Sequence, residues 1–103
     1  MPRSYDYKFL LELQRADPTR LGVKLGRTCV EANLPAAYVA KVLETSKTTV
    51  YSWFRGQGIR EERRSRVEVF IDLIEKDMAA KLLPAKTMID AKLYLRELSG
   101  GLV

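Results

Sequence analysis

The stretch that decides the fold is PAAYVAKVLETSKTTVYSWFRG, residues 35–56, whose apolar pattern predicts two short helices joined by a tight turn. In the first half, Val39, Ala40 and Leu43 recur at helical spacing and predict an amphipathic helix over residues 36–43. Ser46 stands at an N-cap position, because its hydroxyl can accept a hydrogen bond from a backbone amide two or three residues later. A second helix is therefore predicted over residues 47–54.

The second predicted helix has an apolar face and a polar face. Val50, Trp53 and Phe54 are spaced three and four residues apart, so we expect them to face the core. The outer face carries polar, small or basic residues and one aromatic residue: Lys47, Thr48, Tyr51, Ser52 and Arg55. Such a face is suited to contact with a polar or anionic partner.

Six residues carry a resemblance to the helix-turn-helix of the phage repressor and Cro (lambda repressor-like) family: Ala40, Leu43, Ser46, Thr49, Val50 and Trp53. Residues 22–56, about a third of the chain, align with the first three helices of that family. In the family, a small residue is needed where the two helices cross, and here it is Ala40. The resemblance implies that the helix from Lys47 to Phe54 lies in the major groove of double-stranded DNA.

The resemblance also implies roles for individual side chains. The candidates for reading base edges are Lys47, Thr48, Tyr51 and Ser52. The candidates for phosphate contacts are Thr49, Arg55, Gln57, Arg63, Arg64 and Arg66. Lys47 can donate to guanine acceptors or to a phosphate, and Thr48, Thr49 and Ser52 can reach base edges or a phosphate. Either the Tyr51 ring contacts a thymine methyl group while its hydroxyl reaches a phosphate, or Tyr51 simply covers its neighbours.

Two positions differ from the pattern of the family. Glu44 occupies a turn position that is usually Gly, so either Glu44 adopts the left-handed conformation at some cost or the turn has another form. Residues 35–37 offer no polar side chain to a phosphate, although a backbone amide at a helix N-terminus can make that contact. The second helix and the arginines beyond it are therefore expected to supply more of the DNA contact.

The charge distribution supports an anionic partner. The chain has a formal net charge of +5 and a pI near 9.5. Residues 35–66 hold seven Lys and Arg against three Asp and Glu, whereas residues 67–103 hold five against six. A concentrated basic patch is what salt-dependent attraction to phosphates requires. The run at residues 60–66 also has a simpler interpretation, a solvated helix start in which Glu62 and Arg66 pair one turn apart.

Length and composition restrict the class of protein. With 103 residues, 47% hydrophobic and 30% charged, the chain is typical of one soluble globular domain. No apolar run approaches the roughly 20 residues of a membrane span, and the first nine residues lack an apolar signal segment. We therefore expect a cytoplasmic protein, and the resemblance implies a bacterial or phage-infected host cell.

The chain lacks the residue types of most catalytic and metal sites. It contains no His and a single Cys, Cys29, so a Cys/His metal site and histidine-based catalysis are excluded. The simplest interpretation of Cys29 is a small buried hydrophobe, the alternative being a redox role. Neither an enzyme activity nor a cofactor is predicted.

The remaining residues predict further helices and no strands, so the predicted fold is all-α, with five to six helices. Residues 1–17 form an arm and an extra helix capped by Ser4; Pro2 and Arg3 either reach DNA or fray. Residues 18–58 form the helix-turn-helix core, in which Asp17 caps a helix that starts at Pro18 and runs to about residue 32. Residues 59–103 form a pair of C-terminal helices, over about 60–81 and 87–98, within the same domain.

The two C-terminal helices carry apolar residues on more than one face. Met88 is expected in the main stripe of the last helix, whereas Val69, Leu73, Ile89 and Leu93 lie outside the main stripes. Either the two helices bury each other completely or they also form a subunit contact. We expect a homodimer, because small DNA readers often double their contacts by two-fold symmetry.

The sequence thus predicts a sequence-specific regulator of transcription that binds double-stranded DNA in the manner of repressor and Cro proteins. The alternative is a protein-binding adaptor with a helix-turn-helix shape that acts on polymerase or on another regulator, because a fold alone does not fix a function. Binding to duplex DNA that weakens steeply with salt favours the first prediction.

Overall fold

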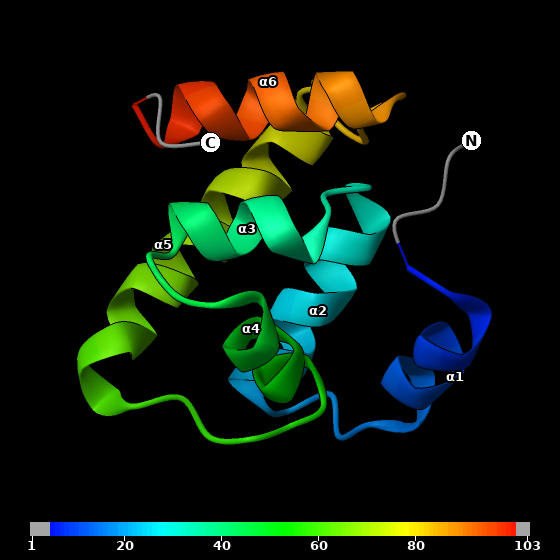
Figure 1. The fold of residues 1–103 in the computed structure, drawn as a ribbon, viewed down its shortest axis with the longest axis vertical. Coiled ribbons are helices and arrows are strands. Elements are labelled where there is room, and N and C mark those ends of the chain that lie inside the picture. The colour runs from blue at the N-terminus through cyan, green and yellow to red at the C-terminus, as the bar shows by residue number, and fades with distance from the viewer. Residues whose placement is uncertain (1–4, 101–103) are drawn as a thin grey trace.

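The computed structural model describes residues 5–100 and confirms the predicted all-α fold, with six helices and no strand in that range (Figure 1). The helices are α1 (Tyr7–Arg15), α2 (Leu21–Glu31), α3 (Ala36–Val42), α4 (Lys47–Phe54), α5 (Glu61–Ala79) and α6 (Met88–Leu98). The predicted arm at Pro2 and Arg3 lies outside the described residues. None of the helices within residues 5–100 is both long and apolar enough to cross a membrane.

The core is one cluster to which every helix contributes buried side chains. Helix α2 packs against α1, α4 and α5, while α3 packs against α4 on one side and α6 on the other (Figure 1). Representative core residues, one for each helix in order, are Phe9, Leu25, Val39, Phe54, Ile71 and Leu95. The α3–α4 pair is therefore supported by helices that come from both ends of the chain.

Helices α2 and α4 approach each other closely at two glycines. A Cβ atom on Gly22 would lie 2.1 Å from the carbonyl oxygen of Trp53, which leaves no space for any side chain. A Cβ atom on Gly26 would lie 3.0 Å from both Leu13 Cδ1 and Phe54 Cγ. Gly22 thus lets the backbone of α2 touch the backbone of α4, and this contact fixes where α4 sits.

The α3–turn–α4 segment forms largely as predicted. Helix α4 begins at Lys47 and ends at Phe54, and Ser46 is its N-cap, since its Oγ accepts from the Thr49 amide at 3.1 Å. Ala40 is buried, as are the predicted inward residues of α4. Glu44 has a φ of 55°, so the first of its two alternatives holds and this residue adopts the left-handed conformation.

Two predicted helix starts are wrong. Helix α1 begins at Tyr7, and its cap is Asp6, whose Oδ1 accepts from the Phe9 amide at 2.8 Å; Ser4 lies outside the described residues. Helix α2 begins at Leu21 rather than at Pro18. The Asp17 carboxylate is used locally, because its Oδ1 accepts from the Thr19 amide at 2.9 Å and from the Thr19 hydroxyl at 2.7 Å. These bonds close a separate turn and lower the pKa of Asp17.

The C-terminal helices do not bury each other completely, so the first of the two alternatives for their extra apolar residues is wrong. Helix α5 buries Val67, Phe70, Ile71 and Ile74, and α6 buries Ala91 and Leu95. The large apolar side chains that stay exposed on these helices and their connection are Val69, Leu73, Leu82, Met88, Ile89 and Leu93. The exposure of Met88 also departs from its predicted place in the buried stripe.

Candidate nucleic-acid interface

Helix α4 presents a polar outer face over a fully buried inner face. Lys47 and Thr48 are exposed, and Ser52 is half-buried, with its hydroxyl donating to the Thr48 carbonyl oxygen at 3.1 Å. Thr49 is half-buried and its hydroxyl oxygen accepts from the Ser46 hydroxyl at 2.9 Å. Three of the four candidate base readers, Lys47, Thr48 and Ser52, thus lie within two turns of one helix face.

Tyr51, the fourth candidate base reader, is held by aromatic side chains of α1 and α4. Its ring centroid lies 5.3 Å from that of Phe9, with the two ring planes at 90°, and 5.7 Å from that of Phe54. Edge-to-face pairs of this kind are favourable beyond the area that they bury. Partial burial raises the pKa of Tyr51, so its hydroxyl stays protonated at neutral pH.

Arg55 extends across Tyr51 at the end of α4. Its Cζ lies 5.8 Å from the centroid of the Tyr51 ring, within the range of a cation–π contact. Its Nε lies 3.6 Å from Glu12 Oε2 of α1, in an ion pair whose two side chains are 57% and 46% exposed. Because exposed pairs contribute little to stability, Arg55 is free to exchange Glu12 for a phosphate at small cost.

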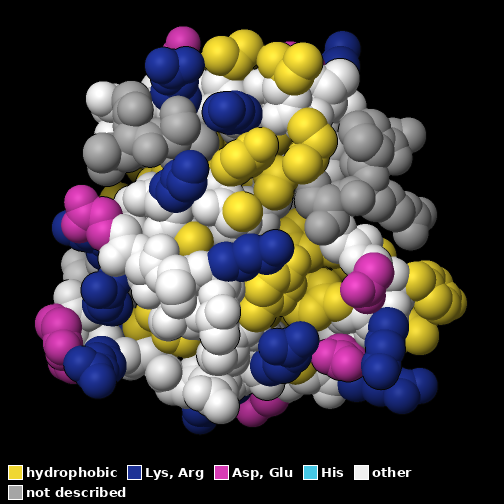
Figure 2. Space-filling model, viewed as in Figure 1, with side chains coloured by type: hydrophobic (Ala, Val, Ile, Leu, Met, Phe, Trp, Pro, Cys, Tyr) yellow, Lys and Arg dark blue, Asp and Glu magenta, His cyan; other side chains and the backbone are white. Residues whose placement is uncertain are grey.

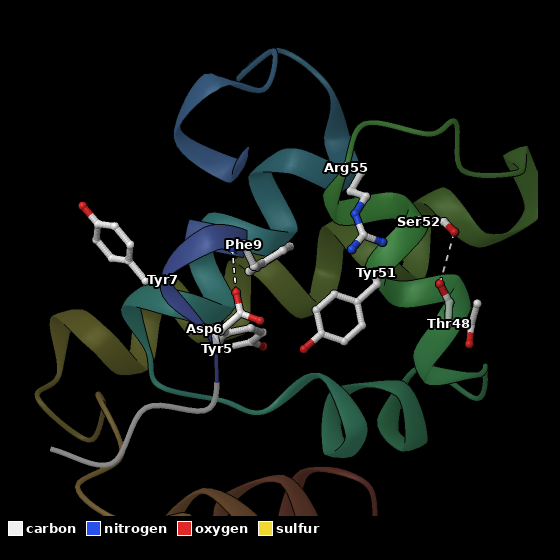
Figure 3. A pocket seen from close by; sticks show the side chains of 8 residues that line it. All are labelled: Tyr5, Asp6, Tyr7, Phe9, Thr48, Tyr51, Ser52 and Arg55. Carbon is white, nitrogen blue, oxygen red and sulfur yellow. Dashed lines mark hydrogen bonds between the residues drawn. The ribbon is translucent and has the colours of Figure 1, made fainter. Parts of the chain in front are cut away.

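Helices α1 and α4 enclose an open hollow of about 770 Å³ (Figure 3). Its wall on the α4 side, the α4 wall, consists of Thr48, Tyr51 and Ser52 with Arg55 just after the helix, and its wall on the α1 side, the α1 wall, consists of Tyr7 and Phe9 with Tyr5 and Asp6 just before the helix. In Figure 2, hydrophobic side chains are visible in the middle of the face, between the polar surface of α4 and the charged surface of α1. The hollow therefore adds an aromatic surface to the polar face of α4.

Tyr5 anchors the α1 wall to the rest of the molecule. Its hydroxyl donates to the Leu34 carbonyl oxygen at 2.5 Å, and its ring stacks on Phe9 with the centroids 5.5 Å apart. Burial raises the pKa of this phenol well above its ordinary value. Tyr5 thus ties the start of α1 to the connection between α2 and α3, and it holds the hollow in shape.

Two of the predicted phosphate contacts are directed toward the protein itself. Arg63 Nη1 donates to the carbonyl oxygens of Leu43 at 3.1 Å and of Glu44 at 3.4 Å. Arg66 Nη1 lies 2.7 Å from Glu44 Oε2, and this hydrogen bond is the main cause of the lowered pKa of Glu44. These two arginines brace the turn between α3 and α4.

The other two phosphate candidates beyond α4 lie outside this brace. Arg64 is half-buried on the first turns of α5, and Gln57 is exposed in the loop after α4. The sequence suggested that Glu62 pairs with Arg66, but in the structure Arg66 pairs with Glu44. Arg64 and Gln57 are therefore available for a partner.

Arg20 is a candidate that the sequence did not indicate. Its Nε donates to the Gly56 carbonyl oxygen at 3.0 Å, which places an exposed guanidinium beside the loop at the end of α4. Gly56 itself has a φ of 103°, a conformation that side chains disfavour. Because 36 residues separate Arg20 from Gly56, no local pattern signals this contact.

Cys29 is fully buried in the core, and this burial raises the pKa of its thiol. A buried, protonated thiol is a poor nucleophile, so its predicted place as a small buried hydrophobe is confirmed.

Comparisons of the chain with protein-family models, curated proteins and solved structures found no match.

Proposed function

We propose that this protein is a sequence-specific regulator of transcription that binds double-stranded DNA through a helix-turn-helix formed by α3 and α4, as in repressor and Cro proteins. The observation that carries the proposal is the two-sidedness of α4. Val50, Trp53 and Phe54 are buried, while Thr48 is exposed and Ser52 half-buried on the opposite side, and Lys47 is exposed in the first turn. An eight-residue helix braced in this way can enter the major groove without disturbing the core.

The distribution of the arginines supports a division of roles. Arg63 and Arg66 contact the turn, so the phosphate candidates that remain beside α4 include Arg55, Arg64 and Gln57, and Arg20 joins them. These contacts position the protein on the duplex, while Lys47, Thr48 and Ser52 read base edges. Because each neutralised phosphate releases counterions, binding to duplex DNA is expected to weaken as the salt concentration rises.

The proposal is tested by the effect of Lys47→Ala on binding to duplex DNA, measured by fluorescence anisotropy over a range of salt concentrations. We expect wild-type binding that weakens with salt, and a larger loss of affinity for the preferred site than for random duplex. The matched control is Lys92→Ala, which removes another exposed lysine, on α6. Wild-type protein without salt-sensitive duplex binding contradicts the proposal, and equal losses on both duplexes make Lys47 a phosphate contact only.

A second copy of the chain is the proposed partner at the C-terminal helices. The exposed side chains of Ile89 and Leu93 lie one turn apart on α6, where they are 71% and 53% exposed. Neighbouring exposed apolar residues of this kind often mark a protein contact. A homodimer would present two copies of α4 to a two-fold symmetric site.

The same exposed apolar residues favour a second candidate function, that of a protein-binding adaptor acting on polymerase or another regulator. The contacts of Arg63 and Arg66 within the protein also support the adaptor function, because they reduce the positive charge available to DNA. Tight binding to a protein without salt-sensitive binding to duplex DNA would favour the adaptor.

A further inference from the structure

The hollow between α1 and α4 has a floor and a rim of different chemistry. The floor is aromatic, because Tyr5 and Phe9 are only 6% exposed and Tyr51 packs edge-on against them. The α4 rim carries hydrogen-bond donors, the Thr48 hydroxyl and the Arg55 guanidinium, whereas the α1 rim carries the Asp6 carboxylate. A group that enters the hollow therefore meets an apolar surface flanked by donors on one side and an acceptor on the other.

A phosphate group is a poor occupant of this hollow. The Arg55 guanidinium can hold a phosphate at the edge of the hollow, but the Asp6 carboxylate on the other rim repels it, and the aromatic floor offers no compensation for the hydration that a phosphate would lose there. In the major groove, thymine presents the complementary combination, an apolar C5-methyl group beside the O4 acceptor. The methyl group fits the Tyr51 ring, and O4 fits a donor on the α4 rim.

The Tyr51 ring is preorganised for such a contact. Phe9 and Phe54 hold it edge-on at centroid distances of 5.3 and 5.7 Å, and Arg55 lies over its face. Figure 3 shows Phe9 and Arg55 beside the Tyr51 ring. A ring fixed before binding loses little conformational freedom when the base arrives. Helix α1, which precedes the segment that resembles repressor and Cro proteins, supplies this support from outside that segment.

We propose that the α1–α4 hollow is a specificity pocket for the C5-methyl edge of a thymine, with Tyr51 as the contacting residue and Phe9 as a positioning residue. The inference rests on the proposed function, since it needs α4 to lie in the major groove. This proposal gives α1 a role in DNA selectivity, which does not follow from the basic charge of the chain or from the α3–α4 pair alone.

The test replaces each thymine of the preferred duplex by deoxyuridine in turn, which removes the methyl group and nothing else. At one position, wild-type affinity is expected to fall about fourfold, the effect of one buried methylene-sized group. Tyr51→Phe should keep this thymine-to-uracil ratio, because the ring is retained, whereas Tyr51→Ala and Phe9→Leu should reduce it toward one. Tyr38→Ala, at a half-buried tyrosine on α3 outside the hollow, is the matched control and should leave the ratio unchanged.

The ratio separates failure of this inference from failure of the proposed function. A protein that binds the duplex in a salt-dependent manner but shows no thymine with a methyl effect overturns the pocket and leaves the DNA-binding proposal intact. A methyl effect that survives in Tyr51→Ala, or one that appears only when 5-methylcytosine replaces cytosine, also overturns the assignment. Circular dichroism of each variant checks its folding, and Phe9→Leu supplies the positioning test if Tyr51→Ala does not fold.

Discussion

The α2 side and the α5 side of the α3–α4 pair are built from different kinds of contact. On the α2 side, Gly22 brings one backbone against another, in the buried core. On the α5 side, Arg63 and Arg66 reach the turn through long, partly exposed side chains. The backbone contact at Gly22 leaves no space for movement, whereas the arginine side chains can change conformation and keep their contacts. This contrast indicates that α2 sets the position of α4, whereas α5 stabilises the turn that precedes α4.

Gly22→Ala should produce the largest effect, because it places a Cβ atom 2.1 Å from the Trp53 carbonyl oxygen, where neither backbone can yield without shifting α4. We expect a loss in the free energy of unfolding of about 3 kcal/mol or more, measured by urea denaturation. Gly58→Ala is the control, since its Cβ atom would meet only Arg20 Nη2, at 3.9 Å. Equal stability of Gly22→Ala and wild type would show that the α2–α4 contact is not close-packed.

Arg63→Ala should have an intermediate effect. It removes two hydrogen bonds to the carbonyl oxygens that follow α3, so the free energy of unfolding should fall by about 1 kcal/mol. Arg64→Ala, which removes the neighbouring guanidinium, should leave stability within about 0.5 kcal/mol of wild type and should weaken binding to random duplex instead. If Arg63→Ala weakened binding to random duplex and left stability unchanged, Arg63 would be a phosphate contact instead.

The Glu44–Arg66 pair should give the smallest effect, one that depends on pH. The hydrogen bond from Arg66 lowers the pKa of Glu44 in the folded protein, so the ionised carboxylate is favoured by folding. Its contribution to stability is present above the pKa of an unfolded Glu, and it is lost as pH falls through the lowered folded value. Wild type should therefore melt slightly above Glu44→Gln at neutral pH, and this difference should vanish in strong acid.

A matched background separates the pair from other acid-sensitive groups. In Arg66→Met, the substitution Glu44→Gln should change the acid dependence of the melting temperature much less, because the main group that lowers the pKa of Glu44 is gone and only the weaker effect of the Arg63 charge remains. A difference that persists undiminished in this background would mean that another group, and not Arg66, shifts the pKa of Glu44.

The sequence was sufficient where the signal is local. The Ser46 cap and the inward positions Val50, Trp53 and Phe54 depend on spacing within one helix, and the structure confirms them. The start of α2 was misplaced although its signal is also local, because Asp17 can either cap a helix or close a turn with Thr19. The second arrangement satisfies its carboxylate with two bonds.

The features that depend on distant contacts were not predictable from local patterns. The backbone contact at Gly22 joins residues 31 positions apart, and the aromatic wall joins Phe9 to Tyr51 across 42 positions. The inward roles of Arg63 and Arg66 depend on where α5 crosses the turn, and a run of basic residues does not reveal that. The candidate site was therefore predictable on α4, whereas its α1 wall and its Arg20 neighbour required the structure.

Whether α4 reads the sequence of duplex DNA is decided by selecting bound sites from a pool of random duplexes with the purified protein. We expect enrichment of one consensus, with two half-sites related by two-fold symmetry if the protein is a dimer, and loss of that enrichment in Lys47→Ala. Recovery of unenriched sequences, or of the same consensus with equal yield by Lys47→Ala and by wild type, would contradict sequence reading by α4.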